Sequence, residues 1–315
     1  MNYLASFVLL VFAVVQVSAQ KLTPVELKNF RNREDSLKKH ANLIINGDDA
    51  AVRFRSDSNF TRILVRGLVQ KNSFLFPFDS LKTISRLYAP DSSFRIFTWQ
   101  VVKDDDYCRQ RGFIQLKTKD GSLQLFPLRD VSEFTQNPVD TVANPGGWMG
   151  AVYYRIIQKE HAGKKFYTLL GYDEHNRRTT RKWIDILWFD ETNTPVLGNP
   201  NGFSFAKDSV PVPSVSRFLL EYKKDARARV QYDEELGIII YDHLVSETNE
   251  PKKKYTLIPD GDYEGFEWKN GQWLHIDKVF DFKLKEGEAP VPVPFNENKL
   301  QSNPPVKPKK PGGGS

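Results

Sequence analysis

Apolar residues recur at helical spacing between residues 22 and 45. Thr23 and Glu26 occupy the two positions of a capping box, which predicts that a helix begins there. Glu34 is the one polar break in the apolar face, and Gly47 is the residue type that commonly ends a helix. We expect an amphipathic helix that packs one face on a partner. That face consists of Leu27, Phe30, Leu37, Ala41 and Ile44.

A second amphipathic pattern predicts a helix over residues 58–69. Asp57 or Ser58 is placed to cap its first turn, because either side chain can accept a hydrogen bond from a backbone N–H group. With the first helix it forms an N-terminal helical segment, assigned to residues 20–85. The apolar residues that would share a face are Phe60, Ile63, Leu64 and Leu68.

From about residue 94 the apolar period changes to two, the period of strands. Short turns join several segments, and Asn270-Gly271 is the strongest hairpin signal among them. Short connections favour antiparallel neighbours, so residues 86–285 are predicted to be a mainly β domain, an antiparallel meander that forms a sandwich or open barrel. With the two helices the class is α+β overall, and a small propeller is the alternative. The predicted strands are 94–101, 112–118, 122–128, 151–159, 166–173, 181–189, 216–223, 227–233, 237–243, 254–258, 264–269 and 272–282.

Residues 1–19 have the pattern of a signal peptide. An apolar run from Leu4 to Val17 precedes small residues, so cleavage is predicted between Ala19 and Gln20. The run is too short to span a bilayer, which takes about 20 apolar residues. The mature chain is therefore expected to be exported, periplasmic or extracellular, without a membrane span.

Residues 286–315 are rich in proline and lysine and are predicted to be a disordered tail. From Ala289 onward the chain holds four lysines and one acid, Glu297, and so carries three of the six excess positive charges. The rest of the chain is close to neutral. This distribution argues against a basic patch for nucleic acid.

Composition and motifs restrict the chemistry. Cys108 is the only cysteine, so an intrachain disulfide is impossible, and a buried small hydrophobe is its simplest interpretation. The sequence contains no CxxC, HExxH, G-x-S-x-G, Walker or G-x-G-x-x-G motif, so no metal and no cofactor is expected. Aromatic residues make up 13% of the chain, which favours strands and leaves open a ligand face lined by rings.

Two carboxylates are candidates for acid–base chemistry. Asp185 lies in a segment that is apolar on both faces, and Asp242 continues an apolar strand face beside His243. A carboxyl group on a buried face has a raised pKa and can act as a general acid, and two such groups close together can hydrolyse a glycosidic bond. The simpler alternative is that these acids accept backbone hydrogen bonds at strand ends.

Asp260, Asp262 and Glu264 concentrate oxygen donors between Pro259 and Gly265. Calcium binds six to eight such oxygens, so this segment is a weak candidate for a calcium loop. The proline and glycines favour a plain turn.

Several motifs together are similar to one known family. The chain resembles an uncharacterised family of exported proteins from Bacteroidetes-type bacteria, over roughly residues 20–285. The resemblance implies a bacterial host and export, and it carries no activity or site. The motifs are APD at 89–91 with FRIFTW at 94–99, YTLLGYD at 167–173, KWIDIL at 182–187, and YDHL at 241–244 with PDG at 259–261.

These observations favour a binding protein over an enzyme. The expected function is an exported soluble binding or structural module of the cell envelope, whose partner is an envelope component or a glycan. The alternative is a secreted hydrolase with an Asp-based site at Asp185, Asp242 or His243.

Overall fold

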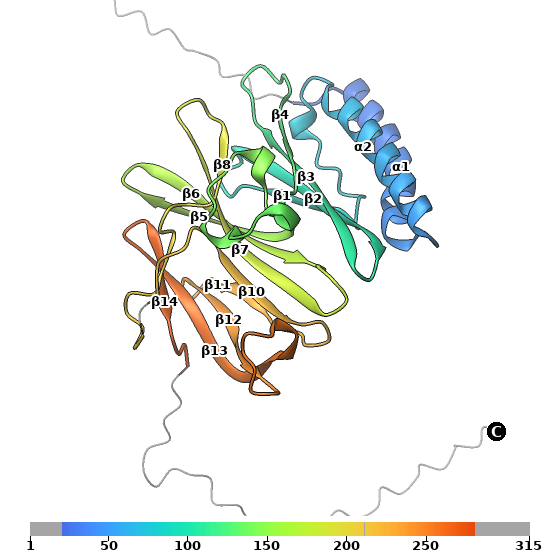
Figure 1. Ribbon diagram of the computed structural model, residues 1–315. Helices are drawn as coiled ribbons and strands as arrows, with labels where there is room; N and C mark the ends of the chain where they lie inside the picture. Colours follow the sequence, from blue (N-terminus) through green and yellow to red (C-terminus); the bar gives the residue numbers. More distant parts are fainter. Residues whose placement is uncertain (1–20, 211, 281–315) are drawn as a thin grey trace, which may run out of the picture. The chain divides into compact units, whose positions relative to one another are not determined.

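A computed structural model describes residues 21–210 and 212–280 (Figure 1). Within these ranges two α-helices and three mostly antiparallel sheets form a mainly β, α+β fold without a closed barrel, which confirms the predicted class. The described elements belong to one compact unit that ends at Val279. The predicted signal peptide with its cleavage point, and the predicted tail, lie outside the described residues.

Helix α1 (Pro24–Asn46) begins at the predicted capping box. The Oγ1 atom of Thr23 accepts a hydrogen bond from the Glu26 N–H group, and the Glu26 carboxylate accepts one from the Thr23 N–H group. The polar break at Glu34 has a tertiary cause, since its buried carboxylate accepts a hydrogen bond of 2.7 Å from the Ser80 N–H group.

Helix α2 (Ala50–Leu68) begins eight residues earlier than predicted. Asp49 caps it by accepting a hydrogen bond of 2.8 Å from the Val52 N–H group, so the expected cap at Asp57 or Ser58 was wrong. Charged residues in the first half of α2 hid its amphipathic pattern in the sequence. One of them, Asp57, is fully buried against the neighbouring sheet. No helix in the described part of the chain is long and apolar enough to cross a membrane.

The sheets follow the chain closely. The first has the order β1-β2-β3-β4, from β1 (Ser85–Tyr88), β2 (Phe94–Asp104), β3 (Tyr107–Leu116) and β4 (Gln124–Leu128). The second has the order β10-β7-β6-β5, with β8 on β7, from β5 (Val152–His161), β6 (Lys164–Asp173), β7 (Thr179–Phe189), β8 (Pro195–Leu197) and β10 (Phe218–Lys223). The third has the order β11-β12-β13-β14-β9, from β9 (Phe203–Ser204), β11 (Val230–Asp233), β12 (Ile238–Ser246), β13 (Leu257–Lys269) and β14 (Gln272–Ile276).

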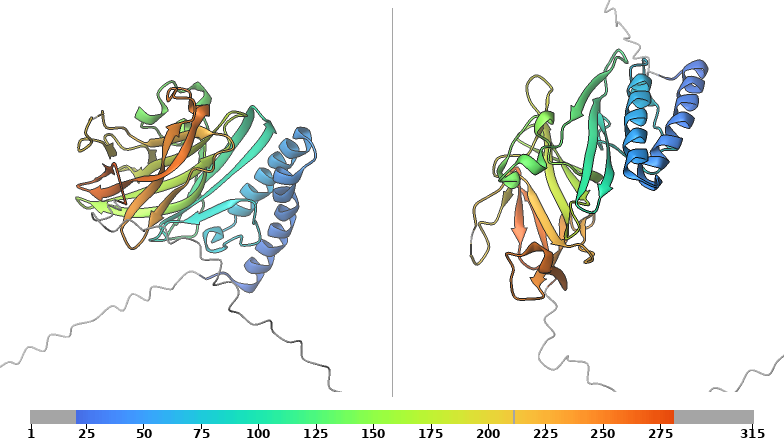
Figure 2. Two further views of the ribbon diagram at one scale, coloured as in Figure 1. Left: turned by 90° about the horizontal axis from the view of Figure 1, so that it is seen from below. Right: turned by 45° about the vertical axis from the view of Figure 1, so that its right-hand side comes forward.

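These elements stack in layers: the helices, then the first, second and third sheets (Figure 2). Each interface between layers holds its own apolar core. On β2, Trp99 packs toward the helices and Ile96 toward the second sheet. On β7, Trp183 belongs to the core shared with the first sheet and Ile184 to the core shared with the third. The second sheet is covered on both faces, which explains why the middle of β7 is apolar at nearly every position.

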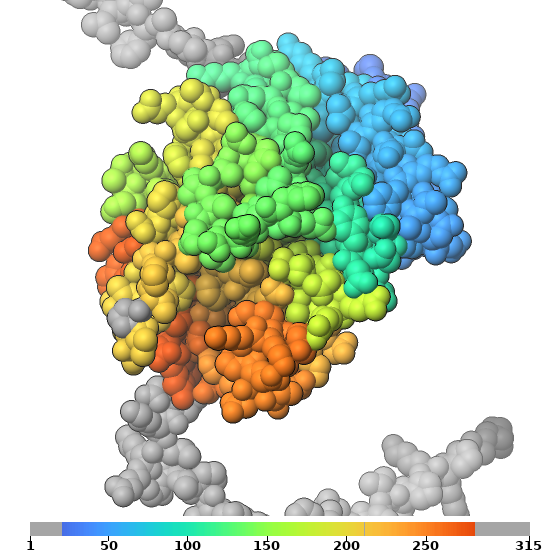
Figure 3. Space-filling view, in the orientation of Figure 1, coloured from blue at the N-terminus to red at the C-terminus, as the bar shows by residue number. Residues whose placement is uncertain are grey.

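The segment between β4 and β5, green in Figure 3, lies on the face of the molecule shown there. It is held by a bridge from Asp130 to Trp148, a second bridge from Ala143 to Leu197, and a hydrogen bond from the Arg217 N–H group to the Val139 carbonyl. Short 3₁₀ turns shape it, at Ser132–Phe134, Pro138–Asp140 and Pro145–Gly147; two further turns lie at Ser73–Leu75 and Lys254–Thr256.

One predicted loop is part of a strand. Residues 259–265 belong to β13, which pairs with β12 at residues 257–259 and 263–267. Between these two stretches residues 260–262 form a bulge opposite Asp242 and Leu244. Aspartate, glycine and proline are depleted in strands, so composition alone indicated a turn. The short strands β1, β8 and β9 were also not predicted, because a few residues show no measurable alternation.

Candidate functional site

Asp185 lies inside the molecule, on the face of β7 that packs toward the first sheet, and is 1% exposed. Its Oδ1 atom accepts a hydrogen bond of 2.9 Å from the Ile186 N–H group and lies 3.5 Å from the Nε atom of Arg217, which is itself fully buried. Burial raises the pKa of Asp185, and the Arg217 charge opposes that shift. Asp185 is therefore the partner of a buried arginine and has almost no access to solvent.

Asp242 lies in the third sheet and is held by the backbone. Its Oδ2 atom accepts a hydrogen bond of 2.8 Å from the Arg229 N–H group, as the simpler interpretation of a strand acid expects. Asp185 lies in the second sheet and shares no hydrogen-bond partner with Asp242 within the ranges that the structure covers. The structure does not bring these two predicted carboxylates into one site.

His243 instead meets two acids of the predicted calcium loop. Its Nδ1 atom lies 2.8 Å from Asp260 Oδ2, and its Nε2 atom lies 3.6 Å from Glu264 Oε1. Asp262 points to another neighbour, at 3.8 Å from Lys278 Nζ. Among residues 21–210 and 212–280 no group of three or more His, Cys, Asp or Glu side chains could hold a metal ion. The predicted calcium loop lies within β13, where Asp260 and Asp262 belong to the bulge and Glu264 to the paired part of the strand.

His275 extends the same network and was not singled out from the sequence. Its Nδ1 atom lies 2.9 Å from Asp208, and its Nε2 atom lies 2.9 Å from the Tyr241 hydroxyl and 3.2 Å from Glu264 Oε2. Burial opposes protonation, but the hydrogen bonds with Glu264 and Asp208 outweigh it and raise the pKa of His275. The network joins β12, β13 and β14 to the segment that holds Asp208, so its evident role is to fasten that segment.

A large cleft opens where turns of the first two sheets meet, with a volume of about 990 Å³. The β1–β2 turn, the end of β3, the β5–β6 hairpin and the β7–β8 hairpin form its walls. The half-buried residues Trp188 and Phe189, at the end of β7, are part of its lining. Its three lysines are matched by three acids, so the formal charges cancel: Lys117, Lys164 and Lys165 against Asp91, Asp190 and Glu191.

A set of hydrogen bonds fixes one wall of this cleft. Asp91 accepts bonds from the Lys165 ammonium (2.7 Å), the Tyr167 hydroxyl (2.9 Å) and the Ser93 hydroxyl (2.7 Å). Burial opposes ionisation of this acid, but the hydrogen bonds from Lys165, Ser93 and Tyr167 outweigh it and lower the pKa of Asp91 to about 2. The indole of Trp188 is held by a 3.0 Å bond to the Gly198 carbonyl, so the cleft is preformed.

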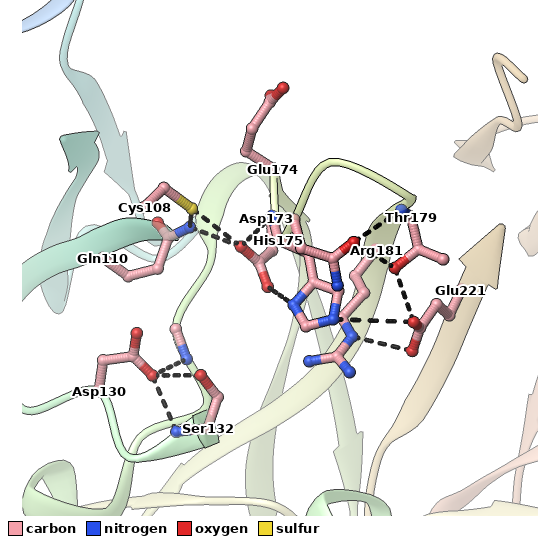
Figure 4. A network of polar contacts seen from close by, with 12 residues as sticks. Cys108, Gln110, Asp130, Ser132, Asp173, Glu174, His175, Thr179, Arg181 and Glu221 are labelled. Carbon is pink, nitrogen blue, oxygen red and sulfur yellow. Dashed lines mark hydrogen bonds and ion pairs between the residues drawn. The ribbon is translucent and has the colours of Figure 1, made fainter. Parts of the chain in front are cut away.

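A second polar cluster lies at the other end of β6 (Figure 4). Asp173, which is 4% exposed, accepts hydrogen bonds from Gln110 Nε2 (2.8 Å) and from the His175 N–H group (3.0 Å), and Cys108 Sγ lies 3.6 Å away. The His175 ring lies between two carboxylates: its Nδ1 atom is 4.0 Å from Asp173 Oδ2, and its Nε2 atom is 3.7 Å from Glu221 Oε1.

Burial sets the protonation of this cluster. It raises the pKa of Asp173 to about 6 and, together with the charge of Arg181, lowers the pKa of His175 to about 4. Burial and the Asp173 carboxylate raise the pKa of Cys108 to about 12. At neutral pH Cys108 is therefore a protonated thiol, which is a poor nucleophile.

We expect Asp173→Asn to stabilise the protein at neutral pH. The folded chain holds the Asp173 proton more tightly than the unfolded chain, so this contribution to stability is present below about pH 4 and is lost as pH rises through about 6. Asparagine keeps an acceptor at Oδ1 and carries no charge. The rise in pKa from 3.8 to about 6 corresponds to about 3 kcal/mol, the expected gain of the variant above pH 7.

Urea unfolding of both proteins between about pH 4 and pH 8 measures this difference. The gain should vanish at the acid end of the series. A gain or loss that is the same at every pH would contradict the raised pKa of Asp173.

Neither the cleft nor the Asp173 cluster follows from a sequence motif. The cleft combines turns that lie about 100 positions apart, and aromatic content was the only indication of a ligand face. The adjacent Asp173, Glu174 and His175, at the end of the strand predicted over 166–173, were the one local signal for the cluster. Comparison of the chain with protein-family models, with curated proteins and with solved structures gives no match.

Proposed function

We propose that this chain is an exported binding module of a bacterial cell envelope and that its large cleft binds a neutral glycan. Export is supported by the predicted signal peptide, and the bacterial envelope by the family resemblance. The glycan is supported by the lining of the cleft, and this is the observation that carries the proposal.

The cleft has the chemistry that an uncharged sugar needs. A sugar ring presents C–H bonds on its faces and hydroxyl groups at its edge, so it suits an aromatic ring beside hydrogen-bonding groups. Trp188 supplies such a ring, and the exposed Lys164 and Asn193 supply polar groups around it. The balanced charges give no preference for an anion or a cation. A volume of about 990 Å³ accommodates a short oligosaccharide.

The hydrolase alternative has less support. It needs two carboxylates at one scissile bond. Asp185 is buried against Arg217, and Asp242 is bound to the backbone of another sheet.

Trp188→Ala tests the proposal. A glycan array probed with the mature chain should retain neutral oligosaccharides, and calorimetry with the best of them gives the affinity. The variant should bind about ten-fold more weakly, because a stacked ring contributes on the order of 1 kcal/mol or more.

Trp268→Ala is the matched control. Both tryptophans are half-buried and pack against the core between the second and third sheets, but Trp268 does not line the cleft. Any loss of affinity that reflects general destabilisation would appear in both variants, and thermal melting reports that effect directly. Retention of no neutral glycan, or equal losses in the two variants, would overturn the proposal.

A further inference from the structure

The positive charge of the described chain is concentrated in its helical layer, residues 21–71. This layer holds eleven lysines and arginines against six acids, whereas residues 72–280 hold 28 against 29. Two of the six acids, Asp48 and Asp49, lie in the turn that joins α1 and α2. The sheets and their loops are therefore close to neutral, and the helices carry the excess. None of the residues that line the large cleft belongs to the helical layer.

Exposed basic side chains cover the outward surface of α1 and α2. On α2, Arg55, Arg62 and Arg66 recur at helical spacing on the face opposite the buried Phe60 and Leu64. The two helices lie side by side as an outer layer of the molecule (Figure 2), so their exposed side chains form one broad surface. Seven exposed residues of α1 and α2 make up this basic face: Lys28, Arg31, Lys38, Lys39, Arg55, Arg62 and Arg66.

The acids of α1 and α2 do not neutralise the basic face. Asp57 is buried and pairs with a guanidinium of β3, so that pair adds no net charge. Glu34 is buried under α1, and Glu26 is bonded within the N-terminal cap. Asp35 is the one exposed acid of these two helices, and it lies 3.4 Å from Lys38. The other six residues of the basic face have no carboxylate partner within residues 21–210 and 212–280.

One end of the helical layer also exposes aliphatic side chains. Val25, Val65 and Val69 are exposed and lie where α1 begins and α2 ends. A hydrogen bond of 3.2 Å from Asn72 Nδ2 to the Glu26 carboxylate joins these two helix ends. Basic and aliphatic side chains are thus combined on one surface.

The form and composition of this surface favour an anionic lipid bilayer as its partner. Its charges lie along two helices that are each roughly 30 Å long, so they match an extended surface better than a small anion. Neither α1 nor α2 has an exposed aromatic ring, on which a nucleic-acid base would stack. Aliphatic side chains beside basic ones suit the boundary between lipid headgroups and acyl chains.

We propose that the basic face of the helical layer binds the surface of a bilayer that contains anionic lipids. Its lysines and arginines would lie at the lipid phosphate groups, and the exposed valines would enter the boundary with the acyl chains. The chain would then lie on the membrane, in keeping with the finding that no described helix could cross one. The proposal is independent of the neutral glycan in the large cleft.

Flotation of the mature chain with lipid vesicles tests the proposal. One set of vesicles contains about 30 mol % phosphatidylglycerol in phosphatidylcholine, and the other contains phosphatidylcholine alone. We expect the chain to float with the anionic vesicles only, and its partition to fall as salt is added. The variant Lys28→Gln/Arg62→Gln/Arg66→Gln should partition about ten-fold more weakly, because each basic residue near an anionic surface adds to the attraction.

Two matched controls remove the same number of positive charges. Arg227→Gln/Lys252→Gln/Lys254→Gln changes three exposed residues outside the helical layer. Lys307→Gln/Lys309→Gln/Lys310→Gln changes the basic segment near the end of the chain. Each control should keep its partition within about two-fold of the wild type. Trp188→Ala should leave flotation unchanged, which separates this surface from the large cleft.

Equal losses in the three triple variants would show that net charge alone attracts the vesicles, and would overturn the proposal. Equal flotation with both sets of vesicles, or none with the anionic set, would overturn it as well. Single-stranded DNA of mixed sequence is the competing polyanion. Binding of this DNA without flotation would assign the basic face to nucleic acid instead. Melting curves should be close to wild type for these variants of exposed residues, which keeps loss of binding distinct from loss of fold.

Discussion

Replacing Asp185 with alanine is expected to lower the free energy of unfolding by about 3–5 kcal/mol. The substitution leaves the guanidinium of Arg217 fully buried without a carboxylate partner among the described residues. An uncompensated buried charge costs this much in other proteins, because neither water nor a counter-ion can reach it. Two of the Arg217 nitrogens, Nε and Nη1, already lack a hydrogen-bond partner among residues 21–210 and 212–280, so this part of the chain has no spare acceptor to offer.

The double variant Asp185→Leu/Arg217→Met is the control for this interpretation. It removes both charges and replaces them with apolar side chains, so it should recover most of the stability that Asp185→Ala loses. Urea unfolding of the two variants and the wild type at pH 7 provides the comparison. A loss below about 1 kcal/mol in Asp185→Ala would show that Arg217 finds another partner.

This result bears on function as well. A carboxylate that stabilises the core cannot be tested as a general acid by simple substitution, since inactivity would report unfolding. The raised pKa that suggested acid catalysis at Asp185 has its cause in burial beside Arg217. Perturbed pKa values mark structural ion pairs as well as active sites.

Local signals in the sequence predicted the parts of the fold that local interactions determine. The Thr23 capping box involves residues three positions apart, so its pattern alone indicated where α1 begins. The Asn270-Gly271 turn similarly joins β13 and β14, and both of its residues have positive φ angles. In such cases the energy that selects the structure lies within a few neighbouring residues.

Other elements depend on distant partners, and the sequence pattern misled there. Residues 259–265 lie within a strand because Pro259 and residues 263–265 pair with β12, while the turn-like residues 260–262 bulge out between these pairs. The large cleft depends still more on distant partners, since its walls come from two different sheets. No spacing rule relates Asp91 to Lys165 or Trp188, so side chains that line one site carried no common signal.

Asp57 in α2 also depends on distant partners. Its replacement is the second substitution for which we expect a large loss of stability. The carboxylate accepts hydrogen bonds from Trp99 Nε1 (2.8 Å) and Arg111 Nε (3.1 Å), and so joins α2 to β2 and β3. Asp57→Ala leaves the buried indole N–H group without an acceptor and releases Arg111. We expect the free energy of unfolding to fall by about 3 kcal/mol.

Ser58→Ala is the matched control, since Ser58 is the neighbouring residue that the sequence also offered as a cap. In the part of the chain that the structure describes, its exposed hydroxyl group bonds only the Phe54 carbonyl, so the substitution should change stability by about 0.5 kcal/mol or less. Asp49→Ala should cost about 1 kcal/mol, the usual effect of losing an N-cap. If Ser58→Ala lowered the free energy of unfolding more than Asp57→Ala does, Asp57 would not be a stabilising bond between the helical layer and the sheet, and this prediction would be wrong.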